Sequence, residues 1–191
     1  MLLKNKKFLT KYTSEVQNLL SDTTTDYSSE ILNLYKFIKE TDKKKGKVII
    51  FGNGGSAATS SHFSVDLMKN AKIKSLNFNE ADFITCLAND FGHDNWVKKA
   101  FEFNTNKSDF SILLSTSGNS KNVINAANYL KRKKFNFFIL TGMKFDNNLK
   151  KINPTNSIWV NSMAYNQIEI VHHFILLAII DMIIGKSVYK A

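Results

Sequence analysis

The sequence predicts an α/β fold in which a parallel sheet is covered by helices on both faces. Short runs rich in branched and aromatic residues are separated by stretches long enough for helices, two of these runs end in glycine-rich or hydroxyl-rich turns, and a long helical pattern comes first. Strands that alternate with helices pair in parallel, because a parallel neighbour needs a crossover connection. We therefore expect a doubly wound sheet preceded by N-terminal helices.

The elements follow from the spacing of apolar residues. Residues 1–45 form an N-terminal helical part, in which a polar interruption at residues 21–26 divides two helices, and residues 46–191 form the α/β core. No internal repeat or low-complexity linker divides residues 1–191, so we expect a single domain. The predicted strands are 47–50, 75–79, 110–114, 135–140 and 157–160, and the predicted core helices are 56–68, 80–89, 95–103, 121–134 and 166–184.

Composition and charge restrict the classes of function. A chain of 191 residues with 43% hydrophobic residues can bury one sizeable core. The net charge is +10, but all of the 26 basic residues except Arg132 are lysines, and they are spread through loops and helix ends. Because no recognition motif accompanies this diffuse charge, we predict no nucleic-acid partner.

The sequence also favours a cytoplasmic protein without a membrane anchor. Residues 1–7 run directly into a polar helical pattern and do not resemble a secretory leader. The single Cys86 supplies neither an internal disulfide nor a cysteine zinc site, which fits a reducing compartment. The apolar run 174–180 is too short for a membrane span before Asp181 interrupts it, so we interpret it as part of a buried helix.

Two turns predict an anion site. Residues 51–56, Phe-Gly-Asn-Gly-Gly-Ser, lie between a strand and a helix, and residues 115–120, Ser-Thr-Ser-Gly-Asn-Ser, lie between the next such pair. A helix N-terminus presents free backbone N–H groups and the positive end of its dipole, and glycines let a ligand approach closely. Since ligands of open parallel sheets bind beyond the carboxyl ends of the strands, we expect both turns to hold one phosphorylated ligand.

With these motifs the chain resembles the SIS (sugar isomerase) domain family, and within it the sedoheptulose 7-phosphate isomerases, also called phosphoheptose isomerases. The resemblance covers almost the whole chain. It rests on four motifs in this order: Gly52-Asn53-Gly54-Gly55-Ser56 followed by His62, Ala88-Asn89-Asp90-Phe91-Gly92, Ser115-Thr116-Ser117-Gly118-Asn119-Ser120, and Leu140-Thr141-Gly142.

The resemblance implies a five-stranded parallel sheet, a homotetramer with active sites between subunits, and aldose–ketose isomerisation that feeds heptose synthesis for surface polysaccharides. It implies no nucleotide cofactor, and it implies a metal at His62. By position, the residues that would hold the phosphate and the sugar are Asn53, Gly54, Ser56, Asn89, Asp90, Ser115, Thr116, Ser117 and Ser120.

His62 and Asp66 lie four residues apart on a predicted helix and therefore share a face. Taken alone, a His and an Asp at this spacing are more often exposed surface residues than members of a functional site. The motif context favours a shared metal or a base with its partner. Where the family has a glutamate this chain has Asp66, whose carboxylate reaches about one methylene less far, and a proton-transfer base must come within about 3 Å of its proton.

The C-terminal helix offers a second group of candidates. The better-known enzymes of the family have a glutamine eight residues ahead of a functional histidine, whereas position 175, eight after Gln167, is isoleucine here. Glu169 can share a helix face with His172 or with His173, and adjacent histidines point about 100° apart, so only one of them can face the site. We favour His173 and keep His172 as the alternative, and both could instead fill polar positions at a subunit interface.

The sequence therefore predicts proton transfer between C1 and C2 of a sugar phosphate through an enediol. Asp66 or Glu169 would act as base and His173 would handle the second proton. One divalent ion, with zinc the best match to these ligands, would be held by His62, Asp66 and His173. The rival hypothesis is a non-catalytic SIS module that binds a sugar phosphate or acts as an adaptor, like the replication-initiator-associated relatives; an isomerase for another sugar phosphate is a third.

Overall fold

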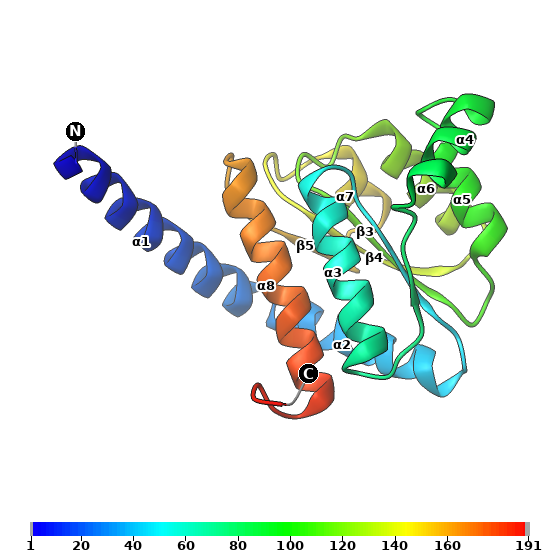
Figure 1. Cartoon of the computed structure of the whole chain (residues 1–191), viewed down its shortest axis with the longest axis horizontal. Coiled ribbons are helices and arrows are strands. Elements are labelled where there is room, and N and C mark those ends of the chain that lie inside the picture. Colours follow the sequence, from blue (N-terminus) through cyan, green and yellow to red (C-terminus); the bar gives the residue numbers. More distant parts are fainter. Residues whose placement is uncertain (1, 190–191) are drawn as a thin grey trace.

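The computed structural model describes residues 2–189 of the chain (Figure 1). Helices and strands alternate through most of this length. The elements are α1 (Leu2–Asp26), α2 (Ser28–Lys43), β1 (Val48–Phe51), α3 (Gly55–Lys69), β2 (Ser75–Leu76), α4 (Ala81–Phe91), α5 (Trp96–Asn104), β3 (Phe110–Ser115), α6 (Lys121–Arg132), β4 (Asn136–Thr141), α7 (Asn148–Ile152), β5 (Ser157–Trp159) and α8 (Tyr165–Ile184).

The five strands form one sheet in the order β2-β1-β3-β4-β5, and every neighbouring pair is parallel. This confirms the predicted fold class. From β1 the chain goes to the β2 edge and then returns to β3 on the other side, so the strand order reverses between β1 and β3. Phe51 at the end of β1 pairs with Leu113 near the end of β3, and the two turns that follow these strands are therefore neighbours.

Two apolar clusters cover the two faces of the sheet. Side chains of successive strand residues point to opposite faces, so Ile50 and Leu114 join the cluster with α2, α3 and α8, while Ile49 and Leu113 join the cluster with α4, α5 and α6. All four of these side chains are completely buried. The sheet is thus enclosed on both faces, and its carboxyl edge, where the turns lie, is the part left open to a ligand.

Helix α8 is the most apolar of the described helices and packs against the sheet. Its buried face includes Ile168, Val171, Leu176 and Ile179, each with no exposed surface. Of the described helices, α8 alone has the length and composition of a membrane span, and 39% of that stretch is buried inside the molecule. A helix that covers a sheet needs an apolar face, so packing against the sheet explains the apolar residues on one side of α8.

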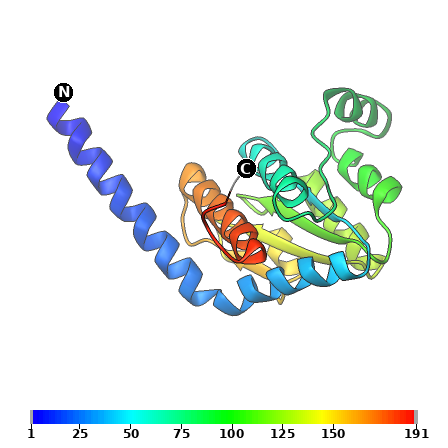
Figure 2. The same cartoon turned by 60° about the horizontal axis from the view of Figure 1, so that its bottom comes forward.

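Helix α1 differs from the prediction because it runs without a break through residues 21–26. The Thr24 hydroxyl donates to the backbone carbonyls of Leu20 at 2.8 Å and Ser21 at 3.1 Å. Such local bonds let polar side chains remain in a helix. The chain bends at Tyr27 instead, and from there the N-terminal half of α1 projects away from the other helices in both views (Figures 1 and 2).

Two short elements also differ from the prediction. The strand expected at 75–79 comprises only Ser75–Leu76, because Asn77 turns the chain by accepting a bond from the Asn79 backbone N–H at 3.1 Å. Helix α7 was not predicted, since five residues are too few to show a helical period. Its start is fixed by the Asn147 side chain, which accepts from the Lys150 backbone N–H at 2.9 Å.

The buried carboxylate of Asp109 joins the beginnings of β1 and β3, and we expect Asp109→Ala to lower the free energy of unfolding by about 3 kcal/mol. The carboxylate accepts from the backbone N–H groups of Lys47 and Asn106, both at 2.9 Å, and from the Lys47 ammonium at 2.6 Å. Urea denaturation measures the loss. The control is Asp94→Ala, which removes an exposed ion pair with Lys121 at 3.8 Å; equal losses in the two variants would contradict the expectation.

Candidate functional site

The turns after β1 and β3 and the start of α8 line one cavity of about 300 Å³. We call it the hydroxyl cavity, because most of its polar side chains are serine or threonine hydroxyls. Ser56, Ser115 and Thr116 are at most 5% exposed, so their hydroxyls are held by the surrounding structure. The lining residues are Asn53, Gly54, Gly55, Ser56, Leu114, Ser115, Thr116, Ser117, Ser120, Tyr165 and Glu169.

Two helix N-termini point into the hydroxyl cavity. Helix α3 begins at Gly55 and α6 begins after Ser120, and neither start has a side-chain cap hydrogen bond. Their first backbone N–H groups can therefore bind an anion, which the two helix dipoles also favour. In the part of the chain that the structure describes, no lysine or arginine lines this cavity, so an anion would be held by neutral hydroxyl and amide donors.

Hydrogen bonds hold the two turns in place before any ligand binds. The side-chain amides of Asn53 and Asn122 exchange two bonds of 3.0 Å, which tie the first turn to α6. In the second turn Gly118 has φ +65°, a conformation that favours glycine, and its N–H donates to the Ser115 carbonyl at 2.9 Å. The donors are thus arranged in advance, which reduces the entropic cost of binding.

A second cavity of about 520 Å³ lies between α3 and α8, and we call it the histidine cavity. His62 Nδ1 and His173 Nε2 are 2.9 Å apart, and the two rings meet edge to face at 86°. Asp66 Oδ2 lies 3.4 Å from the other nitrogen of His62, Nε2. The lining residues are Gly55, Ala58, Thr59, His62, Asn166, Glu169, Ile170 and His173.

The pKa of His173 is lowered from its ordinary value of 6.5, first because the ring is partly buried and second because His62 is close. The carboxylate of Asp66 opposes this shift. His173 is therefore a neutral imidazole near pH 7. In that form one ring nitrogen can accept a proton while the other donates one.

Glu169 connects the two cavities. It lines both of them together with Gly55, and its carboxylate lies so close to Gly55 that a Cβ at this position would overlap it. Glycine at position 55 therefore lets the carboxylate lie against the first turn of α3. A ligand with one end bound in the hydroxyl cavity would extend past Glu169 to reach His62 and His173.

The two adjacent histidines of α8 lie in different surroundings. His173 lines the histidine cavity, whereas His172 is 1% exposed in the core and its Nε2 donates to the Thr141 carbonyl at 3.1 Å. Burial lowers the pKa of His172 from 6.5 to about 4, so the ring is neutral. The structure thus places His173, and not His172, beside His62; a catalytic or metal-binding role for His173 stays a prediction.

Asn89 and Asp90 lie apart from both cavities in the described chain. They are exposed at the end of α4, where the Asn89 amide donates to the Asp90 carboxylate at 3.0 Å. Their predicted contact with substrate remains a prediction. The other predicted residues, with the exception of Asp66 and His172, line at least one of the two cavities.

The predicted metal ligands come together only in part. Among residues 2–189 no group of three His, Cys, Asp or Glu side chains is placed to hold a metal ion. His62 and His173 would supply two nitrogen ligands, but catalytic zinc usually has three protein ligands. Asp66 approaches the far nitrogen of His62, on the side away from His173. The single chain therefore does not fit a complete zinc site.

Three lining residues with polar side chains were not predicted as site residues: Thr59, Asn166 and Tyr165. Thr59 lies three residues before His62 on α3, and Asn166 lies seven before His173 on α8. Helical spacing therefore places each on the same face as a histidine, and that signal could have identified both. Tyr165 begins α8 at the mouth of the hydroxyl cavity and has no comparable signal in the sequence.

Comparison with known proteins agrees with the fold of the chain. The SIS domain family matches residues 11–142. A phosphoheptose isomerase of Sodalis glossinidius is 33% identical over 146 residues, which are 74% of this chain and 73% of that protein. The solved phosphoheptose isomerases of Neisseria gonorrhoeae and Francisella tularensis, each 22% identical, share the fold with TM-scores of 0.83 and 0.85, covering 93% and 94% of this chain and 98% of each of theirs.

The chain therefore belongs to the SIS domain family, whose match covers more than half of its length. Within that family it is similar to the phosphoheptose isomerases. This confirms the resemblance that the sequence motifs indicated.

The buried His172 makes a prediction about acid stability. Because its pKa is about 4 in the folded protein and 6.5 in its ordinary state, the unfolded chain takes up a proton that the folded chain does not as the pH falls between these values. The contribution of neutral His172 to the free energy of unfolding is therefore fully present above pH 6.5, and it falls by roughly 3 kcal/mol as the pH approaches 4. Denaturation of wild type and His172→Gln across this range measures it: the variant should decline less, and parallel declines would contradict the assignment.

Proposed function

We propose that this protein is an aldose–ketose isomerase that converts sedoheptulose 7-phosphate into glycero-manno-heptose 7-phosphate. The observation that carries the proposal is the pair of connected cavities, one suited to an anion and the other to proton transfer, with Glu169 between them. An isomerase for the far end of a phosphorylated chain needs this separation of anchor and chemistry. The similarity to phosphoheptose isomerases supports this choice of substrate.

The phosphate binds in the hydroxyl cavity in this proposal. Ser56, Ser115 and Thr116 present hydroxyls, and the starts of α3 and α6 present backbone N–H groups. Together these donors can surround a dianion without a basic side chain. Binding of the remote phosphate then holds C1 and C2 beside the reacting groups, so that binding energy serves the chemical step.

Glu169 and His173 carry out the proton transfers. The Glu169 carboxylate removes a proton from C1 of the ketose while His173 gives a proton to the C2 oxygen, and the product is an enediol. His173 then takes the proton from the C1 hydroxyl, which becomes the aldehyde oxygen, and Glu169 returns its proton to C2. The overall change moves hydrogen between neighbouring carbons and leaves both side chains as they began.

Asp66 is the second candidate base from the sequence, and it lies further from the route of the ligand. Its carboxylate contacts the Asn70 amide at 3.0 Å and His62 at 3.4 Å, and it lines neither cavity. Glu169 lines both cavities and is therefore our choice of base. Zinc remains part of the proposal as an added ion near His62, and no step above depends on it.

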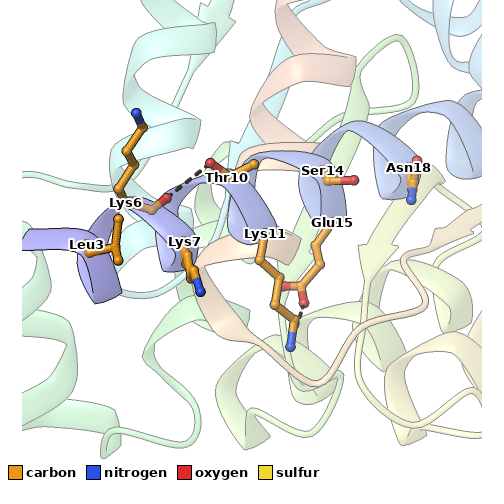
Figure 3. Close-up of a pocket in the computed structure, with 8 residues that line it drawn as sticks. All are labelled: Leu3, Lys6, Lys7, Thr10, Lys11, Ser14, Glu15 and Asn18. Atoms are coloured by element: carbon orange, nitrogen blue, oxygen red, sulfur yellow. Dashed lines mark hydrogen bonds and ion pairs between the residues drawn. The ribbon is translucent and has the colours of Figure 1, made fainter.

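An assembly of several copies, a homotetramer in our proposal, is supported by exposed apolar residues. Phe8 and Leu9 lie on the projecting half of α1 and are 68% and 64% exposed. The shallow pocket along this half of the helix is lined by residues of α1 alone (Figure 3). Ile170 and Phe174 are exposed on α8 beside the histidine cavity. Copies that cover these residues would also enclose the site.

The pathway and compartment complete the proposal. The product would feed heptose synthesis for surface polysaccharides, and the protein would act in the cytoplasm. Cys86 is a free, exposed thiol, which fits a reducing compartment. The alternative is a SIS module that binds the sugar phosphate without turnover.

Proton NMR of sedoheptulose 7-phosphate with the protein in D2O tests the function. We expect exchange of hydrogen at C1 and the appearance of an aldose anomeric signal, with zinc added and with zinc chelated measured in parallel. The Glu169→Gln variant keeps its size and its place on Gly55 but loses the base, so exchange should fall by about 10²–10⁴-fold.

Phosphorus NMR of the same samples supplies the control, because Glu169→Gln should still bind the phosphate in the hydroxyl cavity. Phosphate binding by the wild type without any exchange would support the non-catalytic module instead. Full exchange by Glu169→Gln would remove this residue from the mechanism.

Substitution of exposed apolar residues on the projecting half of α1 should change the number of copies in the assembly. Replacing Phe8 and Leu9 together by glutamate should yield a smaller species, because charge at the interface opposes burial of these side chains. Light scattering coupled to size-exclusion chromatography measures the mass. Lys7→Glu, which changes charge on the same turn without removing apolar surface, is the control, and an unchanged mass in the double variant would rule out α1 as an interface.

A further inference from the structure

His172 is the one buried histidine of the described chain, and the proposed reaction does not use it. Its Nε2–H donates to the Thr141 carbonyl at 3.1 Å, which fixes the tautomer with a bare Nδ1. That Nδ1 is buried and has no hydrogen-bond partner in the structure. An apolar side chain would fill this space without burying an unpaired acceptor, so packing alone does not account for an imidazole here.

The bond that His172 makes lies at the carboxyl end of β4. The same Thr141 carbonyl accepts from the Val160 N–H at 2.9 Å, and the next residue, Gly142, donates its N–H to the Thr116 carbonyl at 3.0 Å. Thr116 is a buried member of the hydroxyl cavity. His172 therefore attaches α8 to the strand end that is itself attached to the hydroxyl-rich turn.

A second contact brings α8 onto the same strand end. A Cβ at Gly142 would lie 2.6 Å from the Ile168 side chain, so glycine at this position allows α8 to approach the backbone closely. Ile168 and His172 are four residues apart and lie on the same face of the helix. Glu169 and His173 each follow one of these two residues directly and line the histidine cavity.

We propose that His172 is a positioning residue for the reaction: its hydrogen bond to the Thr141 carbonyl fixes the rotation and height of α8, and thereby the placement of Glu169 and His173 relative to the phosphate in the hydroxyl cavity. This inference rests on the proposed function for its kinetic consequence. Its structural consequence, the placement of His173 against His62, can be measured without turnover.

Three substitutions of His172 distinguish the effect of its hydrogen bond to Thr141 from the effect of its side-chain volume. In His172→Gln the amide nitrogen stands at the same number of bonds from the backbone as Nε2 and can still donate to Thr141. In His172→Asn the amide is one methylene shorter and reaches only the place of Nδ1, and His172→Leu has no donor. We expect His172→Asn and His172→Leu to lower kcat by about 10–100-fold while the affinity for inorganic phosphate is unchanged, and His172→Gln to remain close to wild type.

Leu176→Ala is the matched control. Leu176 lies one turn further along the buried face of α8 and contacts the core without a hydrogen bond, so this variant loosens the packing and leaves Thr141 untouched. It should lower the melting temperature and keep kcat. An equal loss of kcat in Leu176→Ala would mean that general loosening of α8 is responsible, and would overturn the proposal.

Proton NMR of the histidine rings supplies the measurement that does not depend on activity. The His62 and His173 rings are 4.9 Å apart between centroids and edge to face, so each shifts the signals of the other. These signals should move in His172→Asn and stay in place in His172→Gln; if His172→Leu does not fold, this pair alone decides. Unmoved signals and an unchanged kcat in His172→Asn would overturn the proposal, whereas a wild type without turnover whose ring signals respond as expected would remove only the proposed function.

Discussion

The pairing of β1 with β3 is the constraint on which the site depends. Parallel strands end at the same edge of a sheet, so the register that sets Phe51 against Leu113 also sets the glycine-rich turn beside the hydroxyl-rich turn. The two helices that begin from these turns then point their N-terminal N–H groups into the same space. An anion site follows from the topology, and the side chains refine it.

Helix α8 supplies the part of the site that the strand order alone does not. One of its faces is buried against the sheet and another carries Glu169 and His173, so the position of these two side chains depends on how the helix packs on the strand ends. Two features determine this packing: the absence of a side chain at Gly142 and the hydrogen bond from His172. In the proposed mechanism, packing and catalysis are therefore properties of the same helix.

The sequence predicted the sheet, its parallel pairing and the residues of both turns, because strand ends and glycine-rich turns are local signals. It favoured His173 over His172 but left His172 open as the alternative. A helix with apolar residues almost all around does not reveal which face meets the sheet, and adjacent side chains differ by only about 100°. The break expected at residues 21–26 was wrong, since a polar stretch remains helical when a hydroxyl such as that of Thr24 bonds back to the preceding turn. The sequence likewise contains no sign that Gly55 serves to make room for Glu169.

Because the hydrogen-bond donors that line the hydroxyl cavity are neutral, the attraction of an anion and its selection would depend on different residues. The chain carries a net charge of +10, but none of the basic side chains within residues 2–189 lines that cavity. The net positive charge of the chain attracts anions of every kind, and this attraction weakens as salt rises. In the proposed binding mode, the hydroxyl and amide donors then select the ligand by shape and hydrogen-bond direction, which salt affects little. Encounter rate and selectivity are thus set by different residues, and either can change during evolution without disturbing the other.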